Sequence, residues 1–290
     1  MIDCHTHLTD GAFSVDRDAV LRRAHRAGVR AIAIVGQDLA ENRDVLAAAR
    51  EAREAREARE AREARQARSS GAGEAPGEAG DAHPVLLPFL GLHPDRFADR
   101  KPPFPDSETA AIVALIREHA GDIVGLGEVG LDYWVSQDEE RRAAQREALT
   151  TLAALAMELG LPLNVHSRSA GRHTLELLME RGNTRVLMHA FDGKAGHALK
   201  GAEAGFLFSI PPSIVRSPQK VKLARLLPLE ALALETDSPV LGPVAGERNE
   251  PANVTIAAAA IAEIKGLSEA QVREACAGNA RRLFGLDAET

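Results

Sequence analysis

Two histidines and an aspartate near the start of the chain have the spacing of metal ligands. The sequence opens Met1-Ile2-Asp3-Cys4-His5-Thr6-His7-Leu8, an Asp-x-His-x-His run within a short apolar segment. Side chains alternate between the faces of a β-strand, so this run predicts the two histidines on the face of Asp3, with Cys4 and Thr6 opposite. Two such imidazoles can bind one divalent ion, but a pair of buried core histidines would give the same pattern.

Further candidate ligands stand at or near the ends of later apolar segments. Counting the two in the first segment, five of the ten histidines fall at such positions, together with one aspartate and one glutamate. The later members of this set are His93, Glu128, His166, His189 and Asp237. Imidazoles and carboxylates at so many equivalent positions favour a metal site over scattered core or surface histidines.

Apolar runs and helical segments alternate along the whole chain. The eight predicted strands are Ile2 to Leu8, Val29 to Gly36, Val85 to Leu92, Ile123 to Leu131, Leu161 to His166, Val186 to Phe191, Phe206 to Ile210 and Ala231 to Thr236. Alternation of this kind predicts one α/β domain over residues 1–290, a closed (β/α)8 TIM-type barrel with its active site at the carboxyl ends of the strands. An open doubly wound sheet is the alternative, but no Gly-rich phosphate loop follows the first strand.

Seven short motifs, in order along the chain, resemble those of the TatD-like metal-dependent hydrolases, which are barrels of the amidohydrolase class. They are Asp3-Cys4-His5-Thr6-His7-Leu8, Gly91-Leu92-His93-Pro94, Gly127-Glu128-Val129-Gly130-Leu131-Asp132-Tyr133, His166-Ser167-Arg168, His189-Ala190-Phe191-Asp192-Gly193, Glu235-Thr236-Asp237-Ser238-Pro239 and Arg248-Asn249-Glu250-Pro251. The stretches from Asn164 to Arg172 and from Phe208 to Ile214 are most similar to the third TatD-domain paralogue of animals.

The resemblance implies a divalent-metal-dependent phosphodiesterase, a deoxyribonuclease that acts on nucleic acid ends. It implies one ion on His5, His7 and Asp237 and a second on His166 and His189, with Glu128 bridging the two. Asp237 is also the candidate general base. The mixed imidazole and carboxylate set favours zinc, although magnesium or manganese also suits such ligands.

Several residues near these motifs are candidates for substrate contacts. His93 and Arg168 offer donors to a phosphate, and the Arg fork matches two phosphate oxygens. A core position for His93 and a rim salt bridge for Arg168 are the alternatives. Tyr133 and Trp134, the single Tyr and the single Trp, would either stack on a base or cap the barrel mouth.

The long loop after the last predicted strand holds two more candidates, Arg248 and Asn249. Either they close over the substrate, or they have a structural role at the entry to the helix that starts beyond Pro251.

Charge restricts the expected substrate. The formal net charge is -7, so no general basic field attracts a duplex, and a single-stranded DNA end or another small phosphoester fits better.

The two cysteines cannot form a disulfide framework, and Cys4 is expected to face the helical layer. Without a signal peptide or a long apolar segment, the sequence predicts a cytoplasmic protein with no membrane partner.

A low-complexity segment interrupts the pattern between residues 51 and 82. Glu-Ala-Arg occurs five times from Glu51 to Arg65, followed by a tract rich in Gly, Ser, Pro and Glu up to Ala82. All three repeat residues are favourable in helices, yet a period of three gives no apolar face. This predicts a solvated extension of the second helix with a flexible return, leaving from the end of the barrel opposite the metals. A partner for this helix is one interpretation, and a tolerated repeat expansion is the other.

Three functions fit the sequence. The first is the two-metal phosphodiesterase. The second is an ester or amide hydrolase with the same site, such as an aminoacyl-tRNA deacylase, which would turn over a carbonyl substrate but not DNA. The third is a non-catalytic metal-binding scaffold, against which the complete set of candidate ligands argues.

Overall fold

The chain forms a ring of eight parallel strands. The computed structural model describes residues 1–69, 82–98 and 106–287. Each strand pairs with the next in the order β1 to β8. The strands are β1 (Ile2–Thr6), β2 (Ala31–Val35), β3 (Val85–Leu90), β4 (Gly125–Gly130), β5 (Leu163–His166), β6 (Val186–Met188), β7 (Leu207–Ile210) and β8 (Leu232–Leu234).

The ring closes between β1 and the residues that follow β8. Thr6 forms a parallel bridge with Ser238. The Ser238 carbonyl accepts a hydrogen bond from the His7 N–H at 2.8 Å, and the His5 carbonyl accepts one from the Asp237 N–H at 2.9 Å. The predicted (β/α)8 barrel is therefore confirmed, and the alternative fold, an open doubly wound sheet, is excluded.

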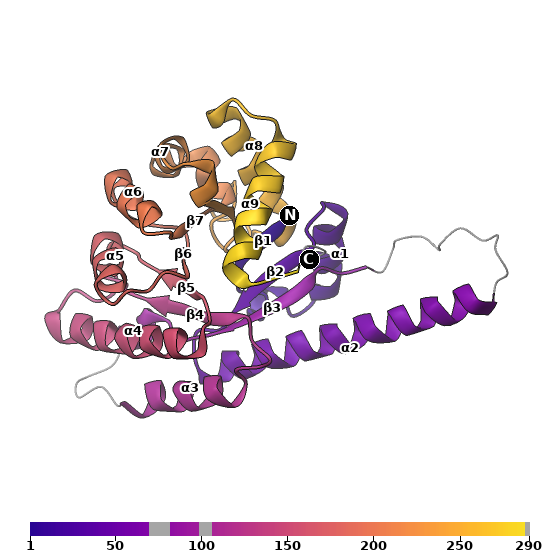
Figure 1. Cartoon of the computed structure of the whole chain (residues 1–290), viewed down its shortest axis with the longest axis horizontal. Helices are drawn as coiled ribbons and strands as arrows, with labels where there is room; N and C mark the ends of the chain where they lie inside the picture. Colours follow the sequence, from indigo (N-terminus) through magenta and orange to yellow (C-terminus); the bar gives the residue numbers. More distant parts are fainter. Residues whose placement is uncertain (70–81, 99–105, 288–290) are drawn as a thin grey trace.

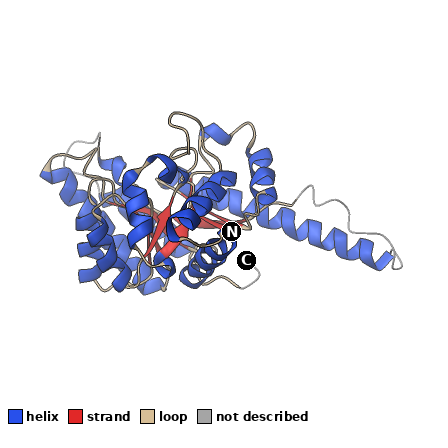
Figure 2. Ribbon diagram, turned by 90° about the horizontal axis from the view of Figure 1, so that it is seen from above, coloured by secondary structure: helices blue, strands red, loops and turns tan. Residues whose placement is uncertain are grey.

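Helices surround this ring, as Figures 1 and 2 show. Their apolar faces pack on the outward side chains of the strands; on α1, for example, Val20, Leu21 and Ala24 are buried. None of the helices in the described ranges is long and apolar enough to cross a membrane. The helices are α1 (Arg17–Arg26), α2 (Leu39–Ser69), α3 (Asp106–Glu118), α4 (Glu139–Leu159), α5 (Gly171–Glu180), α6 (Ala195–Glu203), α7 (Pro218–Leu226), α8 (Val254–Lys265) and α9 (Glu269–Phe284).

The interior of the barrel is filled by small and apolar side chains. Residues from β1, β2, β3, β6, β7 and β8 meet there with the end of α9, and the Phe89 and Phe284 rings make an edge contact at 5.1 Å. The buried members are Ile2, Cys4, Ala31, Ala33, Val35, Leu87, Phe89, Leu187, Leu207, Ala233, Ala280, Leu283 and Phe284. This packed core leaves the polar residues at the carboxyl ends of the strands as the natural site.

The first strand departs from simple alternation. Asp3 pairs with Ile32 and Thr6 with Ile34, so three steps along β1 match two along β2. Such a bulge changes the face of the following residues. Cys4 lies in the barrel interior together with Ile2, so alternation holds as far as Cys4 and the bulge changes the face of the histidines that follow. The prediction that Cys4 faces the helices and that Asp3 shares the face of the histidines is wrong.

Helix α2 continues well past the barrel. It has 31 residues, which corresponds to about 45 Å, and Figure 1 shows its second half projecting away from the sheet. Arg53 lies 3.9 Å from Asp122, ahead of β4, and α2 and the start of β3 line a groove of about 450 Å³. The projecting part thus leaves at the amino ends of the strands. Most of the expected flexible return, residues 70–81, lies outside the described residues.

Candidate metal centre

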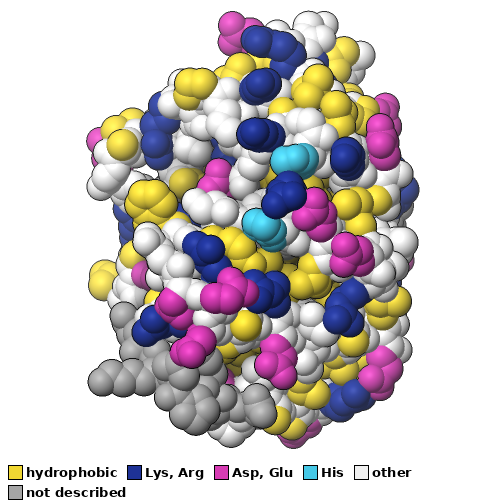
Figure 3. Space-filling view, turned by 90° about the vertical axis from the view of Figure 1, so that its left-hand side faces the viewer, with side chains coloured by type: hydrophobic (Ala, Val, Ile, Leu, Met, Phe, Trp, Pro, Cys, Tyr) yellow, Lys and Arg dark blue, Asp and Glu magenta, His cyan; other side chains and the backbone are white. Residues whose placement is uncertain are grey.

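The six candidate metal ligands and His93 converge at the carboxyl ends of the strands. His5 and His7 lie at the end of β1, Glu128 in β4, and His166 is the last residue of β5. The loops after β3, β6 and β8 supply the others, which are His93, His189 and Asp237. Figure 3 looks onto this end of the barrel, where histidine, basic and acidic side chains gather near the middle of the face.

Glu128 lies between two groups of imidazoles. Its Oε2 is 3.4 Å from Nε2 of both His5 and His7. Its Oε1 is 2.7 Å from His166 Nδ1 and 3.4 Å from His93 Nε2. Glu128 is buried, and Oε2 accepts no hydrogen bond from the described residues. A buried carboxylate oxygen without a donor, faced by two imidazole nitrogens, fits a cation between these groups.

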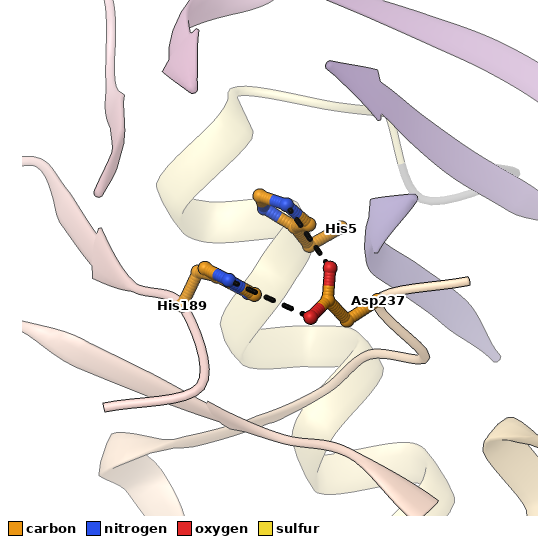
Figure 4. Close-up of side chains that lie close together, drawn as sticks. All are labelled: His5, His189 and Asp237. Atoms are coloured by element: carbon orange, nitrogen blue, oxygen red, sulfur yellow. Dashed lines mark ion pairs between the residues drawn. The ribbon is translucent and has the colours of Figure 1, made fainter. Parts of the chain in front are cut away.

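Asp237 completes the side of the centre nearest β1. Its Oδ1 is 3.4 Å from His7 Nε2 and 3.7 Å from His5 Nε2. Its Oδ2 is 3.9 Å from His189 Nε2, an ion pair that is marked by a dashed line in Figure 4. The backbone of Asp237 is in the left-handed region, at φ 54°. Few residues other than glycine adopt this conformation, and such strain is concentrated at functional sites.

Residues that the sequence analysis did not select hold two of the imidazoles in place. Nδ1 of His5 donates to Asn164 Oδ1 at 2.8 Å, and Asn164 Nδ2 donates to the Cys4 carbonyl, which fixes the amide. Nδ1 of His189 donates to Glu235 Oε2 at 2.9 Å. Both rings therefore present Nε2 to the centre, as is usual for ligands with a hydrogen-bonded second nitrogen.

His166 has the opposite orientation. Its Nε2 lies 3.2 Å from Asp132 Oδ2, and its Nδ1 faces Glu128. The close approach of β4 to β5 requires Gly130, because a Cβ there would lie 2.1 Å from the His166 carbonyl oxygen. A sequence signal for these partners existed: Asn164, Glu235 and Asp132 each lie two or four residues from a candidate ligand.

Mutual attraction between imidazoles and carboxylates determines the ionisation of the centre. Burial would raise the pKa of Glu128, but His93 and His5 hold it well below its usual value. Burial also lowers the pKa of His5, yet Glu128 and Asp237 outweigh it and raise this pKa to about 9. Burial likewise lowers the pKa of His93, but Glu128 and Asp95 outweigh it and raise this pKa to about 10. The carboxylates are ionised at neutral pH, and a cation binding there competes with protons on the imidazoles.

The candidate substrate contacts do not all lie at the centre. His93 does, with its Nε2 3.4 Å from His166 Nδ1. Arg168 is exposed at the rim, directly beyond β5, with its guanidinium 5.2 Å from the Trp134 ring. Tyr133 instead faces α4, because its hydroxyl accepts from Arg146 and Arg142 lies over its ring.

Arg248 and Asn249 make structural contacts rather than contacts with the candidate ligands. The Arg248 guanidinium forms two hydrogen bonds with Asp16, at 2.7 and 2.8 Å. Asn249 is buried, and its Nδ2 donates to the carbonyls of Thr236 and Val240. Asn249 therefore supports the turn that carries Asp237, whereas the exposed Arg248 guanidinium links this loop to Asp16.

The chain is similar to several known proteins. A family model described as TatD related DNase matches residues 67–285. Human "Deoxyribonuclease TATDN3" is 38% identical over 98% of this chain and 94% of its own length. The "Uncharacterized metal-dependent hydrolase YabD" of Bacillus subtilis is 28% identical over 99% of this chain and its full length. The crystal structure of YJJV, a TatD homologue from Escherichia coli, superposes with a TM-score of 0.80 at 24% identity, covering 99% of this chain and 98% of that one.

Proposed function

Because the chain belongs to the TatD related DNase family, we propose that it is a divalent-metal-dependent phosphodiesterase that removes nucleotides from single-stranded DNA ends. The observation that carries the proposal is Glu128, whose two oxygens each face a separate group of imidazoles. A carboxylate can bridge two cations with its two oxygens. The names of the human and Bacillus subtilis relatives, a deoxyribonuclease and a metal-dependent hydrolase, support the same class of reaction.

The ligand set suits two ions, with zinc favoured by its imidazole content and magnesium or manganese as alternatives. His5, His7 and Asp237 would hold one ion, and His166 and His189 the other, with Glu128 between them. His189 lies within 3.9 Å of both carboxylates, which fits a position next to either ion. Two divalent ions there would polarise the phosphoryl group and activate a water nucleophile.

The side chains around the ions have separate roles in this proposal. Asp237 accepts the proton of the attacking water, because its carboxylate is kept ionised: burial opposes this, but His189 and His7 lower its pKa. His93 donates from Nε2 to a phosphate oxygen, and Arg168 binds the phosphate from the rim. Asn164, Glu235 and Asp132 keep the imidazoles oriented through the hydrogen bonds described above.

A substrate panel tests the proposal. The metal-loaded protein is incubated with a 3′-ended single-stranded oligonucleotide and with a simple aryl ester, with and without a chelator. We expect chelator-sensitive release of mononucleotides and little turnover of the ester. Rapid ester turnover without any action on the oligonucleotide would favour an ester or amide hydrolase. Metal binding without turnover of either substrate would favour the scaffold.

A further inference from the structure

Trp134 is a large exposed aromatic side chain at the rim of the barrel mouth. Its side chain is 61% exposed, although it is the only tryptophan in the sequence and lies in the turn directly after β4. Tyr133, beside it in the sequence, is half-buried against α4. An indole left in solvent next to a candidate active site suggests a ligand that stacks on it.

Hydrogen bonds connect the turn that carries Trp134 to the candidate metal centre. Oδ1 of Asp132 accepts from the Trp134 N–H at 2.9 Å, while Oδ2 of the same carboxylate lies 3.2 Å from His166 Nε2. Gln145, fully buried on α4, accepts from the Asp132 N–H and donates to the Ser136 hydroxyl. The backbone of Trp134 is therefore held by the carboxylate that also contacts a candidate metal ligand.

Arg168 completes this part of the rim. Its guanidinium lies over the indole, and the Tyr133 N–H donates to its carbonyl at 3.0 Å, which joins the loops after β4 and β5. Nearby arginines have other partners: Arg146 bonds to Glu139, and Arg172 lies 3.5 Å from Glu176. In the described ranges, Arg168 has no carboxylate within ion-pair distance, so its edge donors remain available to an anion.

We propose that Trp134 and Arg168 form a nucleotide subsite, in which the indole stacks on a nucleobase and the guanidinium binds the phosphate linked to it. This inference rests on the proposed function, because it names the substrate as a nucleic acid with accessible bases. Base stacking requires an unpaired nucleotide, so the subsite selects single strands over duplexes. A chain with net charge -7 needs such local contacts, since no general field attracts the polyanion.

The lone tryptophan provides a direct test, because all indole fluorescence of the protein comes from Trp134. The metal-loaded protein is titrated with a short phosphorothioate-linked single-stranded oligonucleotide, which resists hydrolysis, and with an abasic oligonucleotide of the same length and linkage. We expect saturable quenching with the first and none with the second. Equal fluorescence changes with both would overturn the stacking role.

Binding of a labelled phosphorothioate oligonucleotide by variants gives the second readout. Trp134→Ala should weaken binding about 5- to 150-fold, and Trp134→Phe should restore most of it. Met157→Ala removes a similarly exposed apolar side chain from α4 and should leave binding unchanged. If Trp134→Ala binds like the wild type, the inference is wrong even where hydrolysis is intact. If quenching occurs but no oligonucleotide is hydrolysed, the proposed function fails and the subsite stands.

Discussion

Glu128 is the residue on which the proposed two-ion centre most depends. Its carboxylate lies within 3.6 Å of all five imidazoles at the site, and one of its oxygens is buried without a hydrogen-bond donor. Such a group destabilises the fold unless a positive charge compensates it. Its position is therefore better explained by cation binding than by packing.

We expect Glu128→Gln to lose bound metal and hydrolysis while the barrel stays folded. The amide keeps the shape of the carboxylate but removes its charge and one of its two acceptor oxygens. Metal analysis, circular dichroism and the oligonucleotide assay measure these effects together. A variant with wild-type metal content and rate would contradict the bridging role.

Arg168→Lys tests whether the paired donors of the Arg168 guanidinium matter in addition to its positive charge. A lysine keeps the positive charge but loses the paired donors, so we expect oligonucleotide hydrolysis to fall about 10- to 100-fold with normal metal content. Turnover of an ester without a phosphate should change little. Arg172→Lys, at a nearby arginine that pairs with Glu176, is the matched control. Equal oligonucleotide rates for wild type and Arg168→Lys would remove Arg168 from the phosphate site.

At this scale the ligands could be predicted from the sequence, because a metal restricts residue type and position more strongly than packing does. That the histidines do not share the face of Asp3 could not be predicted. It depends on the bulge in β1, which arises from pairing with β2 and with the end of β8 rather than from local sequence. The role of Arg248 could not be predicted either, because its partner Asp16 is 232 residues away in the sequence.

Among the elements, the strands were predicted at the right places but mostly too long. The apolar run Val186 to Phe191, for example, contains β6 only as far as Met188. The chain leaves the sheet there, and Ala190 has φ 35°, so His189 can turn toward the centre while its neighbours pack elsewhere. Apolar runs indicate buried segments, and the loops at the barrel mouth are buried like the strands, so the runs extend beyond the strand ends.

Helix α2 gives an element-scale prediction. Ala52 still packs against the main core, whereas Glu57, Ala58, Glu60, Ala61 and Arg62 are exposed. Replacing residues 56–81 by a Gly-Ser linker should therefore leave the catalytic constants unchanged and the free energy of unfolding within about 1 kcal/mol. Replacing residues 51–82 should cost more, because it also removes Ala52 and the Arg53 contact with Asp122. A large loss of activity in the shorter replacement would mean that the arm serves the active site or an essential assembly.

For the whole molecule, the charges buried at the barrel mouth link stability to pH. The pKa of His5 is raised to about 9 and that of His93 to about 10, chiefly because Glu128 outweighs the effect of burial. Unfolded histidines titrate near 6.5. In the metal-free protein, the stabilisation from these protons is complete below pH 6.5 and is lost as the pH rises through the folded pKa values.

We therefore expect the metal-free protein to become less stable between pH 7 and pH 8, by at most about 1.4 kcal/mol for each of the two histidines. Lys220 acts in the opposite direction, mainly above this window, because burial lowers its pKa to about 8 and the folded protein therefore loses this proton before the unfolded chain does. Urea unfolding in the presence of a chelator at several pH values measures the slope. Glu128→Gln should flatten it, because the charge that raises both histidine pKa values is gone. Stability that rises from pH 7 to pH 8, or an equal slope in the variant, would contradict this coupling between Glu128 and the two imidazoles.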